Sequence, residues 1–118
     1  MKDKFSIKVD GVERDIKMTM GLVNKLAAIS GDIDGASTMS IDNDLREAAL
    51  VVLLSPRDNK GKIIETIDLD NVEVDQEAVL ELLDWAAEHT LDFLLKALQR
   101  TKALQDRNLD RVKALMPS

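Results

Sequence analysis

One stretch of the sequence, between Asp75 and Pro117, contains neither glycine nor proline. Apolar residues recur through it at spacings of three and four residues, which is the period of an α-helix. Aspartate is a favoured N-cap, so Asp75 marks the place where such a helix would begin. The sequence therefore predicts one helix over 75–115, and the rest of the fold has to be arranged around it.

The apolar residues of this helix form two adjacent rows. The first row comprises Val79, Leu82, Leu83, Ala86, Thr90, Phe93, Leu94, Ala97 and Leu104, and the second comprises Leu80, Leu83, Ala87, Leu91, Leu94 and Leu98. Together the rows are wider than the ~100° that a helix needs in order to pack on one core. We therefore expect residues 79–104 to provide both core contacts and partner contacts, with Leu91, Leu98 and Leu104 as the exposed part.

The length of this helix conflicts with a compact body. A helix of about 40 residues spans about 60 Å, whereas a compact domain of this size has a radius of gyration of about 13–14 Å. The helix must therefore break or project. The polar segment 105–110 (QDRNLD) is the predicted break point. Beyond it, Leu109, Val112 and Leu115 form a small apolar face that could fold back or dock on a neighbouring copy.

The N-terminal residues alternate between polar and apolar side chains. The alternation over 5–9 resumes over 12–16, after the pair Asp10-Gly11. An Asp-Gly pair supplies the positive φ angles that a two-residue turn requires. Residues 1–17 are therefore predicted to form a β-hairpin. Two strands alone are marginally stable in water, so the hairpin must pack against helices.

Two shorter helices are predicted between the hairpin and the long helix. Helical spacing predicts one over 19–30, with Thr19 as N-cap, and one over 42–54, capped by Asp42 or Ser40. The run LVVLL in the second segment also permits a strand, because valine favours strands. The preceding DNDLREAAL favours a helix, and Ser-Pro then ends it.

The segments between these helices lack helical spacing. Residues 30–41 hold glycines and serines with few apolar positions and are predicted to form a loop. Residues 63–69 alternate more regularly and could make a third short strand beside the hairpin. The predicted fold class is therefore α+β and mainly helical. We expect one domain over 1–118, in which the hairpin packs on a three-helix core with a long C-terminal helix.

The side-chain inventory argues against an enzyme. Cysteine is absent and His89 is the single histidine, which excludes a thiolate nucleophile, an iron–sulfur cluster and a cysteine zinc site. Glu88 and Asp92 could share a helix face with His89, but no set of nucleophile, base and orienting group can be assembled around it. We therefore expect no catalytic residue, no cofactor and no metal ion.

Charge and hydropathy limit the class of partner. The chain has 16 basic and 22 acidic side chains, a net charge of −6, and such a surface is repelled by phosphate backbones. The longest apolar run, 48–54, is far shorter than the ~20 residues that a membrane span requires. The charged N-terminus is not followed by the apolar segment of a secretory signal. We therefore expect a cytoplasmic protein that binds neither nucleic acid nor a membrane.

The charges are distributed unevenly along the chain. Residues 65–92 hold ten acidic side chains and no lysine or arginine, whereas residues 96–113 hold six basic and two acidic ones. Acid before base suits the macrodipole of a single helix. The same polarity suits head-to-tail pairing, in which the basic end of one copy meets the acidic region of the next and builds a ring or spiral. Both interpretations stay open at this point.

Trp85 has two interpretations as well. It lies beside the wide apolar stripe, so it either packs in the core or forms an exposed aromatic anchor of the kind found at interfaces. Adding it to the exposed leucines and the basic end of the helix gives the candidate contact residues. These are Trp85, Leu91, Leu98, Leu104, Arg100, Arg107 and Arg111.

The opening segment KFSIKVDGVERDIKMTMGLVNKLAAISGD leads into an acidic, cysteine-free and mainly helical remainder. In this layout the chain resembles the tail assembly chaperones of long-tailed bacteriophages of the siphovirus type, the lambdoid phages among them. The resemblance implies a non-enzymatic assembly factor in the host cytoplasm. Such a factor associates with itself, coats the tape measure protein to keep it soluble, and recruits tail tube protein.

A second class of function would use the acidic residues of 65–92 directly. An acidic phage adaptor or inhibitor can mimic nucleic acid and occupy the basic groove of its target. Binding to a nuclease or a polymerase would reveal this class.

Overall fold

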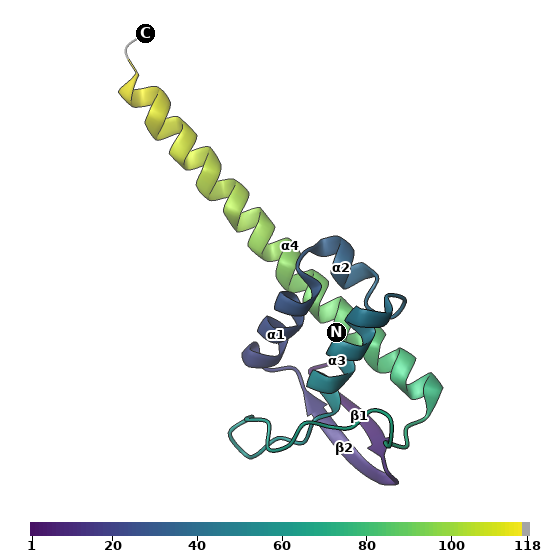
Figure 1. Ribbon diagram of the computed structural model, residues 1–118. Coiled ribbons are helices and arrows are strands. Elements are labelled where there is room, and N and C mark those ends of the chain that lie inside the picture. The colour runs from purple at the N-terminus through teal and green to yellow at the C-terminus, as the bar shows by residue number, and fades with distance from the viewer. Residues whose placement is uncertain (117–118) are drawn as a thin grey trace.

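The computed structural model describes residues 1–116, so Pro117 and Ser118, the end of the domain predicted over 1–118, lie outside the described part. The elements in chain order are β1 (Lys4–Val9), β2 (Val12–Lys17), α1 (Met20–Ser30), α2 (Ile33–Ser37), α3 (Asn43–Leu54) and α4 (Gln76–Leu115). The hairpin and the shorter helices pack together against one part of α4 (Figure 1). The predicted mainly helical α+β fold is therefore confirmed.

The N-terminal hairpin forms as predicted over 1–17. β1 and β2 pair antiparallel from Lys4 opposite Lys17 to Val9 opposite Val12. Asp10 and Gly11 make the turn with φ angles of 52° and 79°, the positive values that the Asp-Gly pair supplies. The backbone N–H of Asp10 donates to the carbonyl of Glu73 at 2.9 Å, which ties the turn to the segment that precedes α4.

The predicted helices over 19–30, 42–54 and 75–115 are confirmed to within a residue or two at their ends. Each begins at a side chain that accepts a hydrogen bond from the backbone N–H three residues further on: Thr19, Asp42 and Asp75. The cap of α3 is therefore Asp42 and not Ser40. The LVVLL run is helical, because Leu53 and Leu54 are buried on the face that α3 turns to the core.

The prediction of a loop over 30–41 was wrong, because this segment contains α2. The Asp32 carboxylate caps α2 by accepting from the backbone N–H of Gly35 at 2.8 Å. Ala36 in α2 and Met39 just after it are completely buried. A helix of five residues is too short to show apolar periodicity, and its stability comes from the cap and these tertiary contacts.

The third strand considered for 63–69 does not form, and the sheet within residues 1–116 has two strands. Its one ladder contact is an isolated bridge between Arg57 and Ile63. The backbone N–H of Ile67 instead donates to the Ser55 hydroxyl at 3.1 Å. The backbone N–H of Ile64 donates to the Pro56 carbonyl at 2.9 Å, so the segment is held by single hydrogen bonds to the residues that follow α3 and not by a neighbouring strand.

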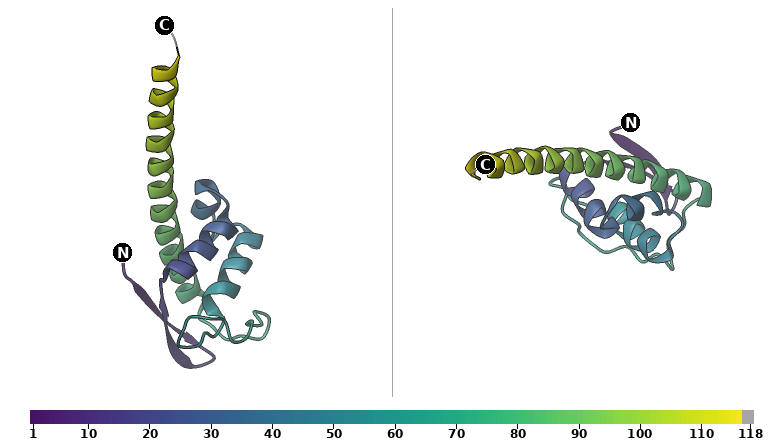
Figure 2. Two further views of the ribbon diagram at one scale, coloured as in Figure 1. Left: turned by 90° about the vertical axis from the view of Figure 1, so that its left-hand side faces the viewer. Right: turned by 90° about the horizontal axis from the view of Figure 1, so that it is seen from above.

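The predicted break at 105–110 was also wrong, because α4 runs without interruption from Gln76 to Leu115. A break would create two new helix ends with unsatisfied backbone groups, whereas Asn108 inside the helix costs only a small loss of propensity. The helix therefore projects beyond the other elements (Figures 1 and 2). The molecule accordingly measures 70 × 31 × 23 Å, with a radius of gyration of 18.3 Å.

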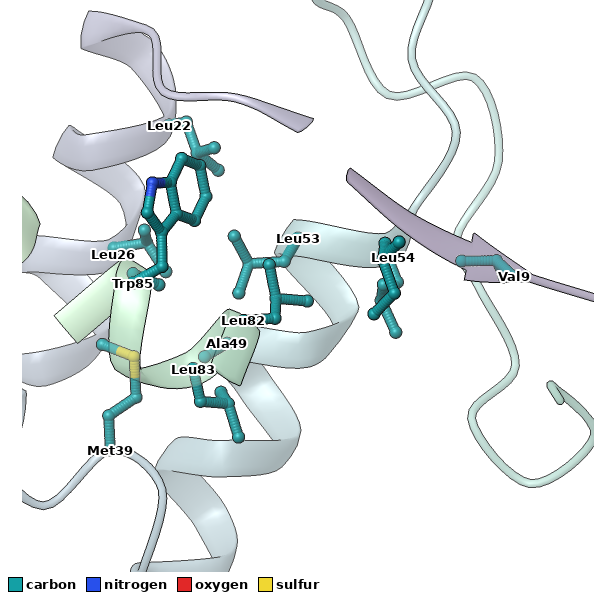
Figure 3. Packing of buried hydrophobic residues seen from close by; sticks show 12 residues of the cluster. Val9, Leu22, Leu26, Met39, Ala49, Leu53, Leu54, Leu82, Leu83 and Trp85 are labelled. Atoms are coloured by element: carbon teal, nitrogen blue, oxygen red, sulfur yellow. The ribbon is translucent and has the colours of Figure 1, made fainter. Parts of the chain in front are cut away.

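The core lies where the first half of α4 meets the hairpin and the shorter helices. Leu26, Leu54, Leu82 and Leu83 are almost completely inaccessible to solvent and belong to one cluster with Met39. Figure 3 shows the leucines gathered from the helices and Met39 from the turn after α2, with a strand residue, Val9, at the edge of the cluster. None of the core residues comes from the second half of α4.

Gly35 offers a direct test of how α2 is held. A Cβ atom at this position would lie 2.0 Å from the carbonyl oxygen of Ser30, a distance that forces the backbone to move. We predict that Gly35→Ala lowers the free energy of unfolding by about 2 kcal/mol, as overpacking does. Denaturant unfolding followed by circular dichroism measures it.

The matched control is Gly21→Ala, in α1, where the nearest atom to an added Cβ is 3.9 Å away. This variant should be neutral or slightly more stable, because alanine favours a helix over glycine. Equal destabilisation by both substitutions would contradict the packing of α2 described above.

Candidate interaction surface

The row of α4 residues that forms the core continues past the end of the body. At seven-residue steps, Leu83 and Thr90 are completely buried, whereas Leu104 is 54% exposed. Ala97, between them, is also exposed. We call residues 97–116 the projecting segment. It is about 30 Å long at the helical rise of 1.5 Å per residue.

The projecting segment has one side without charge. At about 100° per residue, Lys102 and Arg111 border an arc of about 180° in which no charged residue of the segment falls. The arc contains Ala97, Leu98, Thr101, Leu104, Gln105, Asn108, Leu109, Val112, Leu115 and Met116. We call these residues the uncharged face, and all of them are exposed. Its six large apolar side chains have between 47% and 85% of their surface exposed.

The exposed apolar side chains of the uncharged face are typical of a surface that binds a partner. A helix projecting into water gains nothing from an apolar face, and a segment without tertiary contacts depends on its weak intrinsic propensity. Contiguous exposed apolar side chains bordered by charged ones are typical of surfaces that bind another protein. The uncharged face is therefore the candidate functional site of this chain.

Five of the seven predicted contact residues lie on the projecting segment. Leu98 and Leu104 are on the uncharged face, and Arg100, Arg107 and Arg111 lie along one edge of it. All five are exposed. Leu91 is half-buried, because it lies on the part of α4 that still packs on the body. The sequence analysis placed Leu109 and Leu115 on a separate small face beyond the break predicted at 105–110, whereas the uninterrupted helix joins them to Leu98 and Leu104 in one face.

Trp85 is in the core, which answers the question its position left open. Only 7% of its surface is exposed. The indole Nε1–H donates to the carbonyl of Lys2 at 2.8 Å, and the ring lies 5.7 Å from that of Phe5. Trp85 therefore holds the N-terminus against α4 and is not available as an exposed anchor.

His89 serves the same N-terminal contact. Its Nε2 is 2.7 Å from the Lys2 carbonyl, which can only accept, so Nε2 carries the proton in this hydrogen bond. The imidazole also packs edge-on against Trp85, with ring centroids 5.2 Å apart. His89 therefore helps Trp85 to hold the N-terminus against α4.

The acidic and basic regions predicted from the sequence are both at the surface. Of the ten acidic residues in 65–92, nine are exposed, and the tenth, Asp92, is half-buried. Asp92 forms an ion pair with Lys96 at 2.9 Å, at the junction of the two regions. Asp68 and Asp75 also accept hydrogen bonds from neighbouring residues while staying exposed. We call residues 65–92 the acidic region.

Arg14 and Arg57 line a concavity on the body near the end of α3, where both make structural hydrogen bonds. Arg14 donates to the carbonyl of Leu54 at 2.6 Å, and Arg57 donates to those of Val52 and Gly61 at 3.0 and 2.8 Å. Burial lowers the pKa of the Arg57 guanidinium from its ordinary value. Both guanidinium groups therefore neutralise the negative C-terminal end of α3.

Residues 1–116 contain no cluster of side chains that could hold a metal ion. Among the helices in that range, none is both long enough and apolar enough to span a bilayer.

Comparisons with known proteins give no relative to which this chain can be assigned: no family model, no curated protein and no solved structure matches it. The exposed surface of α4 is therefore the main indication of function in this chain.

Trp85 is buried and Leu104 is exposed, so a substitution of Trp85 should affect stability and a substitution of Leu104 should affect association. Trp85→Phe removes a buried hydrogen-bond donor and should lower the free energy of unfolding by at least about 1 kcal/mol without changing the oligomeric state. Leu104→Ala should leave the stability of the dilute chain nearly unchanged but weaken association. Denaturant unfolding and light scattering measure the two effects, and a changed oligomeric state in folded Trp85→Phe would contradict the assignment.

Proposed function

We propose that this chain is a non-enzymatic tail assembly chaperone of a long-tailed bacteriophage, acting in the host cytoplasm. In this role it associates with itself, coats the tape measure protein and recruits tail tube protein. The observation that carries the proposal is the uncharged face of α4, which leaves the body as an exposed helix over 97–115. The resemblance of the N-terminal layout to tail assembly chaperones supplies the class of partner.

A helical partner suits the uncharged face. Side chains three and four residues apart line one side of a helix and pack into the grooves of another helix. Burying a large apolar side chain contributes up to about 1.5–3 kcal/mol, of which part is offset by the loss of freedom on binding. Six such side chains on one segment support association with a long helical protein such as a tape measure.

The charges support self-association in one direction. The basic residues beside the uncharged face would be repelled by a second projecting segment laid along them, and attracted by the acidic region of another copy. A contact between two different surfaces repeats from copy to copy and builds a ring or a spiral. An assembly of this shape could surround an extended helical protein.

The exposed acidic region also supports a second candidate. Nine exposed acidic residues, in a stretch of sequence without lysine or arginine, could occupy a basic groove, as in a protein that mimics nucleic acid. This candidate does not use the uncharged face, so the two functions respond differently to substitutions on α4.

The test replaces two leucines of the uncharged face. Leu98→Glu combined with Leu104→Glu should convert an associating chain into a monomer, because carboxylates cannot be buried without a partner. Size-exclusion chromatography with light scattering gives the mass. Ala103→Glu is the matched control, since Ala103 is exposed on the charged side of the same segment.

Partner binding is tested by co-expression with the longest helical protein encoded next to this chain's own gene. The wild-type chain and Ala103→Glu should keep that protein soluble, and the double variant should not. A wild-type chain that is monomeric at high concentration and leaves the neighbour insoluble would refute the chaperone function. Retained binding of a nuclease or polymerase by the double variant would instead favour the mimic.

A further inference from the structure

A groove lies where α4 leaves the body. It has a volume of about 350 Å³ and is lined from α4 by Leu94, Ala97, Leu98 and Thr101, and from the start of α2 by Asp32, Ile33 and Asp34. Figure 1 shows α2 beside α4 at the point where the projecting segment begins. The groove therefore joins the body to the uncharged face.

The lining has an apolar floor and an acidic rim. Ile33 and Leu94 are half-buried in it, while Asp32 and Asp34 are exposed at its edge. Asp32 already accepts the capping hydrogen bond from Gly35, and Asp34 adds a second carboxylate. No lysine or arginine lines the groove, so its rim attracts a cation that accompanies an apolar group.

The C-terminal turns of α4 have the complementary chemistry. Leu115 is 85% exposed and Met116 65% exposed, and Arg111 and Lys113 lie beside them. We call residues 111–116 the tip. It combines exposed apolar side chains with two cations, whereas the groove combines an apolar floor with two carboxylates.

The tip cannot reach the groove of its own chain. Thr101 and Leu115 belong to one uninterrupted helix, so 14 residues of helical rise, about 21 Å, separate them. A continuous helix does not bend back over such a distance. A tip that fills this groove must come from another molecule.

We propose that the groove is the docking site for the α4 tip of a second copy of this chain. The inference rests on the proposed function, because it names the contact through which the chaperone associates with itself. Groove and tip are different surfaces, so each copy offers one of each, and the contact can repeat in one direction.

The test uses one variant that blocks each surface. Ala97→Trp places an indole in the groove, and Leu115→Asp puts a carboxylate on the tip, where it meets the acidic rim. Each variant alone should be monomeric, with association weakened at least tenfold. Equimolar mixing should then give a 1:1 pair and nothing larger, because one intact tip meets one intact groove. Light scattering and analytical ultracentrifugation measure these masses.

The controls repeat the same substitutions on the charged side of the helix. Ala103→Trp and Ala114→Asp lie on exposed positions outside the uncharged face and should assemble like the wild type. Asp34→Lys is a second groove variant, which reverses the rim charge without filling the groove and should weaken association several-fold. Circular dichroism confirms that each variant keeps its helix content.

The outcomes separate this inference from the proposed function. A wild-type chain that assembles while folded Ala97→Trp and Leu115→Asp assemble equally well would overturn the groove contact and leave the chaperone function standing. A mixture of the two that stays monomeric would also overturn it. A wild-type chain that never associates would refute the proposed self-association, and the groove contact with it.

Discussion

One helix with a single continuous apolar side determines this structure. The first half of α4 buries that side against the hairpin and the short helices, with Leu82, Leu83 and Ala86 completely inaccessible. The body is too small to cover the rest, so the same side continues into solvent over 97–116. The apolar side of α4 therefore supplies both the packing that stabilises the chain and the surface available to a partner. Because the docked half already forms helix, the projecting half extends it without a separate nucleation cost.

Contacts distant in sequence fix the body against α4. The Lys2 carbonyl accepts hydrogen bonds from Trp85 and His89, which holds the N-terminus against α4. At the other end of the hairpin, Asp10 exchanges hydrogen bonds with Glu73 through both its backbone and its carboxylate. The hairpin is thus fastened at its start and at its turn. This explains how a sheet of only two strands stays folded, since packing against helices replaces further strands.

Local signals in the sequence were enough to predict the hairpin and the starts of three helices. The pair Asp10-Gly11 makes the turn of the hairpin, and the N-caps Thr19, Asp42 and Asp75 each bind a backbone N–H three residues further on. Features that depend on distant contacts were not predictable. Besides its Asp32 cap, α2 depends on the burial of Ala36 and of Met39 just after it, and the direction of Trp85 depends on a partner 83 residues away. The groove escaped detection for the same reason, since its two walls come from separate parts of the chain. On α4, the exposed leucines could be predicted by counting apolar rows, whereas the continuation of the helix through 105–110 could not.

Hydrogen exchange of the wild-type chain, measured by mass spectrometry at low and high protein concentration, tests the central claim most directly. The account predicts that residues 82–90 exchange slowly at both concentrations because they are packed in the core. Residues 97–116 should exchange rapidly in the dilute chain and become protected as the concentration rises, and the Leu98→Glu, Leu104→Glu double variant should lose that gain. Rapid exchange of 97–116 at every concentration, alongside a protected core, would show that the uncharged face has no partner in another copy and would contradict the account.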